Sequence, residues 1–305
     1  MKKTLLTICL VWMCFSLSAQ KIIDLSGKWS FSIDRQDNGE KEKWFSHTLN
    51  DFINLPGSMP EKLKGDEVTA KTQWTGSLYD SSYYYNPYME KYRKEGNIKF
   101  PFFLTPDKHY VGAAWYQKEV NIPADWKGER ILLFLERPHI ETTVWVNGQK
   151  TGMQNSLCVP HQYDITHYVR PGKCTITIRV DNRIKEINVG PDSHSITDQT
   201  QGNWNGIVGR ICLQTTPKTY FDDIQIYPEP EQKLARVKVV IKGTGTAKVK
   251  LSAESFNTDK KHIVPAIQQE IKLNKGVTET EMVLPMGNDM LLWDEFHPAL
   301  YKLIA

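Results

Sequence analysis

The sequence predicts an all-β protein made of two consecutive β-sandwiches, and three patterns carry this prediction. Thr143, Trp145 and Asn147 alternate with Val144 and Val146, a period of two that indicates a half-buried strand. Asn147-Gly148 then supplies residues that tolerate the positive φ of a tight hairpin turn. Residues 131–135 form an unbroken apolar run, which is typical of a strand covered on both faces.

Further strands are predicted on either side of this hairpin. Residues 24–34 place Trp29 and Phe31 on one face, with lysine and serine on the other. Residues 175–180 repeat the alternation after a Pro171-Gly172 turn. Antiparallel strands joined by short turns exclude a nucleotide-binding α/β fold, which would alternate strands with helices.

Five segments carry a family resemblance through their order along the chain: WYQKEVNIP (115–123), ETTVWVNGQKTG (141–152), PHQYDITHYVRPG (160–172), ITIRVDN (176–182) and WNGIVGRICL (204–213). Together they resemble the successive strands of the N-terminal sugar-binding domain of glycoside hydrolase family 2, the β-galactosidase, β-glucuronidase and β-mannosidase group. The resemblance implies a galactose-binding-like jelly-roll sandwich over residues 20–217. It also implies a carbohydrate partner of the β-linked galactoside or glucuronide type.

A second pattern begins after Thr216-Pro217. Residues 237–241, 248–253, 269–273 and 280–284 alternate in the manner of short strands, and about six strands with regular turns predict an immunoglobulin-like sandwich over 218–305. Residues 298–303 resemble the start of the final strand of the family's second domain. The sequence stops at Ala305, so we expect this last strand to be incomplete.

The loop that enters the strand at residues 115–122 holds the first candidate binding residues. The resemblance places His109 and Tyr110 nearest the sugar, because relatives carry substrate contacts on this loop. Alternatively, His109 caps the loop through hydrogen bonds. The preceding segment, residues 61–106, contains a tyrosine cluster at 79–88 and is either a flap packed over the sandwich or a surface on which sugar rings stack.

The second candidate loop spans residues 183–205. In the family the equivalent loop points into the active site of a neighbouring barrel, where an acidic residue contacts sugar hydroxyls. Asp192 and Asp198 are the nearest acidic candidates, and Asn203, Trp204 and Asn205 stand at the return of the loop. The family pattern is not fully matched, since no acidic residue immediately precedes Trp204. A structural role for Trp204, packing beside Ile207 and Ile211, is the alternative.

The N-terminus predicts a secretory signal peptide over residues 1–19, with Lys2-Lys3, an apolar stretch and a final Ser18-Ala19. The protein is therefore expected to be periplasmic or secreted, without a membrane span. A lipoprotein anchor at Cys14 is an alternative. Removal of the peptide would lower the formal charge from +3 to +1, which gives no electrostatic reason to expect nucleic acid or an anionic membrane as partner.

Three cysteines, Cys158, Cys174 and Cys212, follow the predicted peptide. Their spacing matches neither a disulfide framework nor a zinc site, and Cys174 shares the parity of a core face. A single bridge in an oxidising compartment is left open. No residue is predicted to bind a metal ion, although metal use is left open, and no cofactor is expected.

Catalytic motifs are missing from the printed sequence. Retaining glycosidases need two carboxyl groups about 5–5.5 Å apart, and in this family both are glutamates of a (β/α)₈ barrel, one of them in an Asn-Glu pair. The sequence has no Asn-Glu dipeptide, nucleophile elbow, P-loop or His-Glu-x-x-His motif. The acidic pair Asp294-Glu295 is interpreted as a solvated turn.

The leading hypothesis is therefore the N-terminal, non-catalytic part of a secreted family 2 glycosidase, whose barrel lies outside this chain. The alternative is a stand-alone carbohydrate-binding or adhesion sandwich, and a third is a structural sandwich of a surface assembly. The sugar identity and the oligomeric state are left open.

Overall fold

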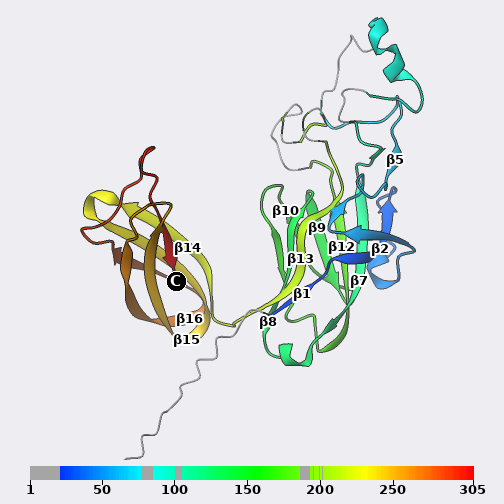
Figure 1. Ribbon diagram of the computed structural model, residues 1–305. Coiled ribbons are helices and arrows are strands. Elements are labelled where there is room, and N and C mark those ends of the chain that lie inside the picture. Colours follow the sequence, from blue (N-terminus) through cyan, green and yellow to red (C-terminus); the bar gives the residue numbers. More distant parts are fainter. Residues whose placement is uncertain are drawn as a thin grey trace, which may run out of the picture. The chain divides into compact units, whose positions relative to one another are not determined.

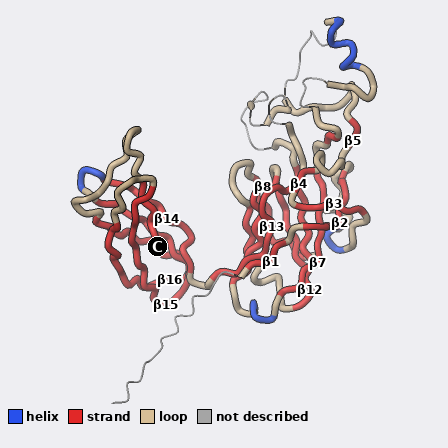
Figure 2. The backbone as a smooth tube through the Cα atoms, viewed as in Figure 1, coloured by secondary structure: helices blue, strands red, loops and turns tan. Residues whose placement is uncertain are grey.

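The computed structural model describes residues 21–76, 85–99, 105–185, 193–194, 196–198, 200 and 202–305 (Figures 1 and 2). These residues form two compact units, the first ending at Thr216 and the second beginning at Pro217. The predicted signal peptide, with Cys14, lies outside the described residues. Strands dominate both units, and four short 3-10 helices are described: η1 (Trp44–Ser46), η2 (Pro87–Arg93), η3 (Ala124–Trp126) and η4 (Pro230–Gln232).

The first unit is a sandwich of two antiparallel sheets. The five-stranded sheet has the order β1-β13-β8-β11, with β4 also paired to β13. Its strands are β1 (Ile22–Asp24), β4 (Gly57–Ser58), β8 (Arg130–Pro138), β11 (His161–Asp164) and β13 (Gly206–Thr216). The six-stranded sheet has the order β10-β9-β12-β7-β2-β3. Its strands are β2 (Gly27–Asp34), β3 (Asp51–Leu55), β7 (Ala113–Ile122), β9 (Glu141–Val146), β10 (Gln149–Asn155) and β12 (Gly172–Asp181).

The core lies between these sheets because each strand turns one set of alternate side chains inward. Phe31 and Tyr116 from the six-stranded sheet and Leu133 from the five-stranded sheet belong to one buried cluster. The opposite face of the six-stranded sheet is also covered, since Trp115 and Trp145 pack against the segment that contains η1. This second cover explains why every residue of β9 is buried.

The predicted hairpin is present, because Asn147 and Gly148 both have positive φ between β9 and β10. The segment at 61–106 contains only small elements: β5 (Asp66–Glu67) pairs with β6 (Lys108–His109), and η2 follows Asn86. Most of its tyrosine cluster, including Tyr79, Tyr83 and Tyr84, lies outside the described residues. Tyr88 is one of the most exposed aromatic side chains described, at 84%.

The second unit has its own cores and fewer, longer strands than the sequence predicts. Its strands are β14 (Tyr220–Glu229), β15 (Leu234–Phe256), β16 (Ile263–Pro285) and β17 (Leu300–Ile304). The turn expected between the predicted strands at residues 237–241 and 248–253 is instead a bulge at Gly243–Gly245 inside the continuous β15–β16 ladder. Positive φ angles at Gly243 and Gly245 let the strand bend without breaking its pairing. Two clusters of buried apolar side chains line the inner faces.

Candidate functional site

Loops meet at one end of the first sandwich. At this end, one row of paired residues runs across the strands of the six-stranded sheet. In that row Asn155 pairs with Glu141, Glu141 with Asp181, Asp181 with Ala113, and Ala113 with Asp34. Three carboxylates thus stand on neighbouring or nearly neighbouring strands. The loop containing His109 enters the row at Ala113, and the loop of residues 183–205 leaves it after Asp181.

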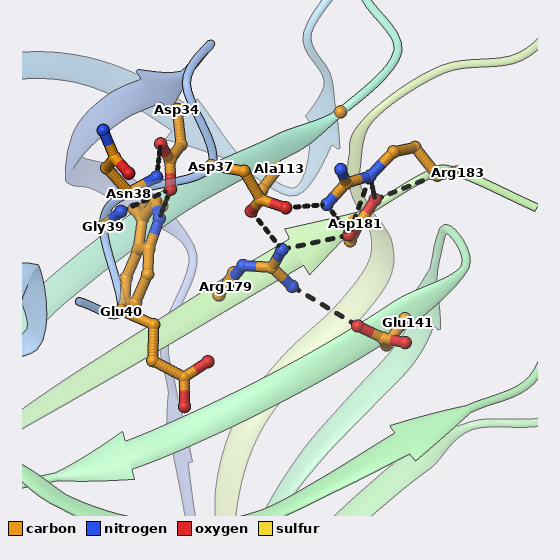
Figure 3. A network of polar contacts seen from close by, with 12 residues as sticks. Asp34, Asp37, Asn38, Gly39, Glu40, Ala113, Glu141, Arg179, Asp181 and Arg183 are labelled. Carbon is orange, nitrogen blue, oxygen red and sulfur yellow. Dashed lines mark hydrogen bonds and ion pairs between the residues drawn. The ribbon is translucent and has the colours of Figure 1, made fainter. Parts of the chain in front are cut away.

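Asp181 is the centre of a charge network that joins three parts of the chain (Figure 3). Its fully buried carboxylate accepts hydrogen bonds from Arg179 at 3.0 Å and from Arg183 at 2.6 Å, and Lys185 lies 2.8 Å away. Arg179 and Arg183 also donate to Asp37. Arg179 and Lys185 reach Glu141 at 3.3 and 2.9 Å.

The network holds Asp37 and Asp181 in their charged forms. Burial alone would raise the pKa of Asp181, but hydrogen bonds from Arg183 and Lys185 outweigh burial and hold the pKa well below the ordinary aspartate range. Burial would likewise raise the pKa of Asp37, but the hydrogen bonds and charges of Arg179 and Arg183 together outweigh burial and lower this pKa. These groups are paired and neutralised, which suits them to fix loop positions and leaves none free for proton transfer.

Asp34 fixes a second loop at the other end of the row (Figure 3). Its carboxylate accepts hydrogen bonds of 2.9 Å from the backbone N–H groups of Asn38 and Gly39 and from the indole of Trp115. Gly39 is required there, since a Cβ atom would lie 2.5 Å from the Trp115 indole nitrogen. The turn that carries Asp37 is therefore rigidly tied to the sheet.

His109 and Tyr110 are buried, with 5% and 6% of their surfaces exposed. The His109 ring packs against Trp74, and its Nε2 lies 3.1 Å from the carbonyl oxygen of Gln73. Nδ1 of His109 is buried without a hydrogen-bond partner. The Tyr110 hydroxyl donates to the carbonyl of Ala113 at 2.9 Å, and burial raises its pKa. Both side chains thus support the loop from within.

Asp198 and Asn203 join the 183–205 loop to the segment before η2. The Asp198 carboxylate accepts hydrogen bonds from the backbone N–H groups of Thr75 and Asn203. The Asn203 amide donates to the Thr75 hydroxyl and to the carbonyl of Asn182, both at 3.0 Å. Asn182 in turn donates to the carbonyl of Tyr110. The structure therefore brings these candidates together with Tyr110, whereas Asp192 lies outside the described residues.

Asn205 and Trp204 have opposite environments. Asn205 is fully buried, accepts a hydrogen bond from the Tyr116 hydroxyl at 2.7 Å and donates to the carbonyls of Gly112 and Val180. Trp204 is only half-buried, and its ring stacks on that of His139 with 4.5 Å between centroids. Burial lowers the pKa of His139 to about 4, so this platform is uncharged at neutral pH. Of the six described candidates, Trp204 is the only one that is not buried.

The charge network was not among the candidates from the sequence. A signal was present, because Arg179, Asp181 and Arg183 recur at a spacing of two beside the apolar series that ends at Val180. Their partners Asp37 and Glu141 come from distant parts of the chain.

The three cysteines form no disulfide bond with one another, because Cys158, Cys174 and Cys212 are all unpaired thiols. Burial raises the pKa of Cys174 to about 11.

Among the described residues, no cluster of three or more histidine, cysteine or acidic side chains has metal-binding geometry. None of the helices described in the structure is long and apolar enough to cross a membrane.

Comparison with known families accounts for the fold. Residues 22–217 match the profile described as "Glycosyl hydrolases family 2, sugar binding domain", and residues 219–305 match "Glycosyl hydrolases family 2". The protein is thus an all-β, two-sandwich member of a carbohydrate-active enzyme family. The chain belongs to glycosyl hydrolase family 2.

Individual relatives have low sequence identity to this chain, and their names are β-glucuronidase and β-galactosidase. A β-glucuronidase of Homo sapiens is 24% identical over 266 residues, which cover 78% of this chain and 35% of the human protein. A β-galactosidase of Clostridium acetobutylicum is 24% identical over 287 residues, covering 92% of this chain and 28% of that protein. This chain therefore spans about a third of the length of the curated relatives that it matches.

Solved structures show the same fold. A β-glucuronidase of an uncultured Clostridium species superposes with a TM-score of 0.57 at 20% identity, covering 94% of this chain and 42% of that one. A Ruminococcus gnavus β-glucuronidase in complex with D-glucuronic acid gives a TM-score of 0.55 at 17% identity, covering 93% and 42%. No (β/α)₈ barrel occurs among the elements described for the present chain.

Proposed function

We propose that this chain is the N-terminal, non-catalytic part of a secreted β-glycosidase of the β-glucuronidase or β-galactosidase type. In this proposal the two sandwiches support a (β/α)₈ barrel that carries the two catalytic glutamates. The first sandwich offers its loop end to the sugar. Residues 1–19 direct export as a signal peptide.

The observation that carries the proposal is the continuous match to the two family profiles, over residues 22–217 and 219–305. Relatives that share both segments are β-glucuronidases and β-galactosidases, each much longer than this chain.

The chemistry of the described carboxyl groups supports a non-catalytic role. A glycosidase acid needs a raised pKa so that it is protonated at working pH. Wherever the pKa of a described carboxyl group is shifted, the shift is downward: Asp24, Asp37, Asp51, Glu61, Asp125, Glu136, Asp164, Asp181 and Asp294. These groups suit structural ion pairs and caps.

Within the loop end, Trp204 is the candidate sugar contact. Its half-exposed ring offers a flat apolar surface with an N–H edge, which suits a pyranose ring. The stacked, neutral His139 holds the indole at a fixed angle. Asp198, Asn203 and Asn205 position the loop that carries Trp204, and His109 and Tyr110 support the neighbouring loop.

The reading frame beyond codon 305 tests the proposal most cheaply. We expect it to encode alternating strands and helices with an Asn-Glu pair at the end of a strand. A stop codon directly after Ala305 in the native gene would contradict the proposal and favour a stand-alone carbohydrate-binding protein. In the extended protein, Trp204→Ala should lower kcat/KM about tenfold or more, as expected for loss of about 1.4 kcal/mol of sugar contact.

A further inference from the structure

The first unit contains three Asn-Gly pairs, at residues 38–39, 147–148 and 205–206. An asparagine that precedes glycine is chemically labile, because glycine has no side chain to shield its backbone nitrogen from the asparagine amide. Attack by that nitrogen releases ammonia and converts the asparagine into an acid. The local sequence does not distinguish the three pairs, but their surroundings in the fold differ.

Asn205 is held on all sides. Its side chain is fully buried, and its oxygen accepts a hydrogen bond from the Tyr116 hydroxyl at 2.7 Å. Its side-chain nitrogen donates to the carbonyl groups of Gly112 and Val180. Breaking these bonds inside the core would leave buried polar groups without partners, at a high cost in free energy. The amide of Asn205 is therefore fixed away from attack.

Asn38 is protected in another way, because the attacking nitrogen is already engaged. The N–H of Gly39 donates to the buried carboxylate of Asp34 at 2.9 Å, and the N–H of Asn38 donates to the second oxygen of the same carboxylate. Attack requires the glycine nitrogen to lose its proton. The adjacent negative charge of Asp34 opposes the anion that would form.

The pair at residues 147–148 lies in the open. It forms the turn between β9 and β10, and β10 is the edge strand of its sheet. The side chain of Asn147 is exposed, and no described residue accepts a hydrogen bond from the N–H of Gly148. Nothing lies within 4 Å of a Cβ position at Gly148. With Thr175, the two residues line an open hollow of about 270 Å³, so water reaches the turn.

Two hydrogen bonds orient the Asn147 amide in the folded protein. Its Oδ1 accepts from the backbone N–H of Thr175 at 3.0 Å, and its Nδ2 donates to the carbonyl of Tyr168 at 3.1 Å. Both bonds are exposed to solvent. Water replaces such bonds when an edge hairpin opens locally, so opening costs little at this turn.

We propose that Asn147 is the site at which the folded protein deamidates spontaneously, whereas the fold protects Asn38 and Asn205. The Gly148 nitrogen loses its proton to water or hydroxide and bonds to Cγ of Asn147. The bond from Cγ to Nδ2 breaks, and Nδ2 leaves as ammonia after taking up a proton. Water then opens the resulting cyclic imide at either carbonyl group, which gives aspartate or isoaspartate.

Either product weakens the hairpin. Aspartate at position 147 has no N–H to donate to the carbonyl of Tyr168 and places a negative charge beside that oxygen. Isoaspartate adds a methylene group to the main chain of a two-residue turn, which disturbs the pairing of Val146 with Gln149. This modification does not depend on the role of the chain in sugar hydrolysis.

Peptide mass spectrometry tests the proposal, because trypsin places the three pairs in separate peptides, 36–41, 131–150 and 186–210. The purified chain is incubated at pH 8, with and without 8 M urea, and sampled over several weeks. In the folded protein Asn147 should convert at least about tenfold faster than Asn38 or Asn205, which corresponds to about 1.4 kcal/mol in barrier height. Urea should bring the three rates close together by accelerating Asn38 and Asn205 most.

Gly148→Ala tests the attacking atom. The added Cβ shields the nitrogen, so conversion of Asn147 should fall at least about tenfold while the other two sites keep their rates. The same slowing is expected in urea, so the result does not depend on how well the variant folds. Gly172→Ala is the matched control, since Gly172 also has positive φ with nothing near its Cβ position, and it should leave conversion of Asn147 unchanged.

Three results would overturn the proposal: a rate at Asn147 no higher than at Asn38 or Asn205 in the folded protein, an acceleration by urea as large at Asn147 as at the other two sites, or an unchanged rate in Gly148→Ala. None of them bears on the reading frame beyond codon 305, so the proposed function would stand in each case.

Discussion

At the scale of single residues, Asp181 determines how the sandwich joins its loops. Its side chain is fully buried and meets three cations, two of which lie on the first residues of the 183–205 loop. A buried charge is tolerated only when it is paired, and removal of one partner leaves the others uncompensated. The network is therefore more sensitive to substitution than an ion pair on the surface.

Asp181→Asn should lower the free energy of unfolding of the first unit by about 3 kcal/mol at pH 7. Urea unfolding followed by tryptophan fluorescence measures this. Because the folded-state pKa of Asp181 lies below the unfolded value, its contribution is present at neutral pH and is lost as the pH falls below about 4. The difference between variant and wild type should shrink over that range.

Glu119→Gln is the matched control. Glu119 of β7 pairs at 2.9 Å with Lys173 of β12, the strand that also carries Asp181, but both side chains are largely exposed. Its loss should cost less than about 1 kcal/mol. Equal costs for the two variants would show that the buried network has no special structural role.

His139 gives a second residue-scale prediction, through pH. Burial lowers its pKa from 6.5 to about 4 in the folded protein. The unfolded chain therefore binds a proton first, and the stability contributed by neutral His139 is complete above pH 6.5 and decreases as the pH falls toward 4. The total is on the order of 3 kcal/mol.

His139→Gln should flatten the dependence of unfolding free energy on pH between 6.5 and 4, measured by denaturant titrations at intervals of half a pH unit. An unchanged slope in the His139 variant would show that this histidine titrates normally in the fold.

At the scale of elements, the start of β13 aligns the residues of the candidate site. Gly206 follows Asn205 and pairs with Ser58 of β4. Its φ is 143°, and a Cβ atom there would lie 2.5 Å from the carbonyl oxygen of Gly57. Only glycine allows the two strands to approach this closely.

Gly206→Ala should therefore destabilise the first unit by about 3 kcal/mol, from backbone strain and steric overlap combined. Gly172→Ala is the comparison, because Gly172 also has positive φ but nothing lies near its Cβ position. It should cost about 1–2 kcal/mol. Thermal unfolding of both variants measures the difference, and similar losses at the two glycines would contradict the close-approach argument.

Element prediction from sequence succeeded where one face of a strand is apolar and turns are marked. The hairpin at Asn147-Gly148, and the alternation of core and surface residues in β2 and β12, were predicted from the sequence for this reason. The prediction of a turn near Gly243–Gly245 was wrong. Glycines often mark a turn, but these two lie at a bulge within paired strands. Local sequence does not distinguish these outcomes, because the partner strand decides between them.

Prediction of the candidate site was limited for a related reason. The loops that meet at the end of the sandwich were identified, but the charge network was missed. Arg179 and Asp37 are separated by 142 positions, and no local pattern reports such a contact. The candidates His109, Tyr110, Asn203 and Asn205 are polar and lie in loops, yet their side chains are buried and hydrogen-bonded within the fold. The polarity of a side chain alone does not show whether that side chain stabilises a loop or contacts a ligand.

At the scale of the whole molecule, both units match family 2 profiles, and each has its own hydrophobic core. The buried carboxylates of the first unit serve structure: Asp34 and Asp198 hold backbone N–H groups, while Asp181 and Glu141 hold cations. Glycoside cleavage with retention needs two opposed carboxyl groups, one of them protonated. The buried carboxylates described in the first unit therefore organise its loops.

The most direct test is an assay of the purified chain on 4-nitrophenyl β-D-glucuronide and 4-nitrophenyl β-D-galactoside. We expect release of nitrophenolate at the rate of the buffer control over pH 4 to 8. Turnover that persists after chromatographic removal of other glycosidases, and that disappears at the unfolding temperature of this chain, would contradict the assignment of the two sandwiches as a non-catalytic support.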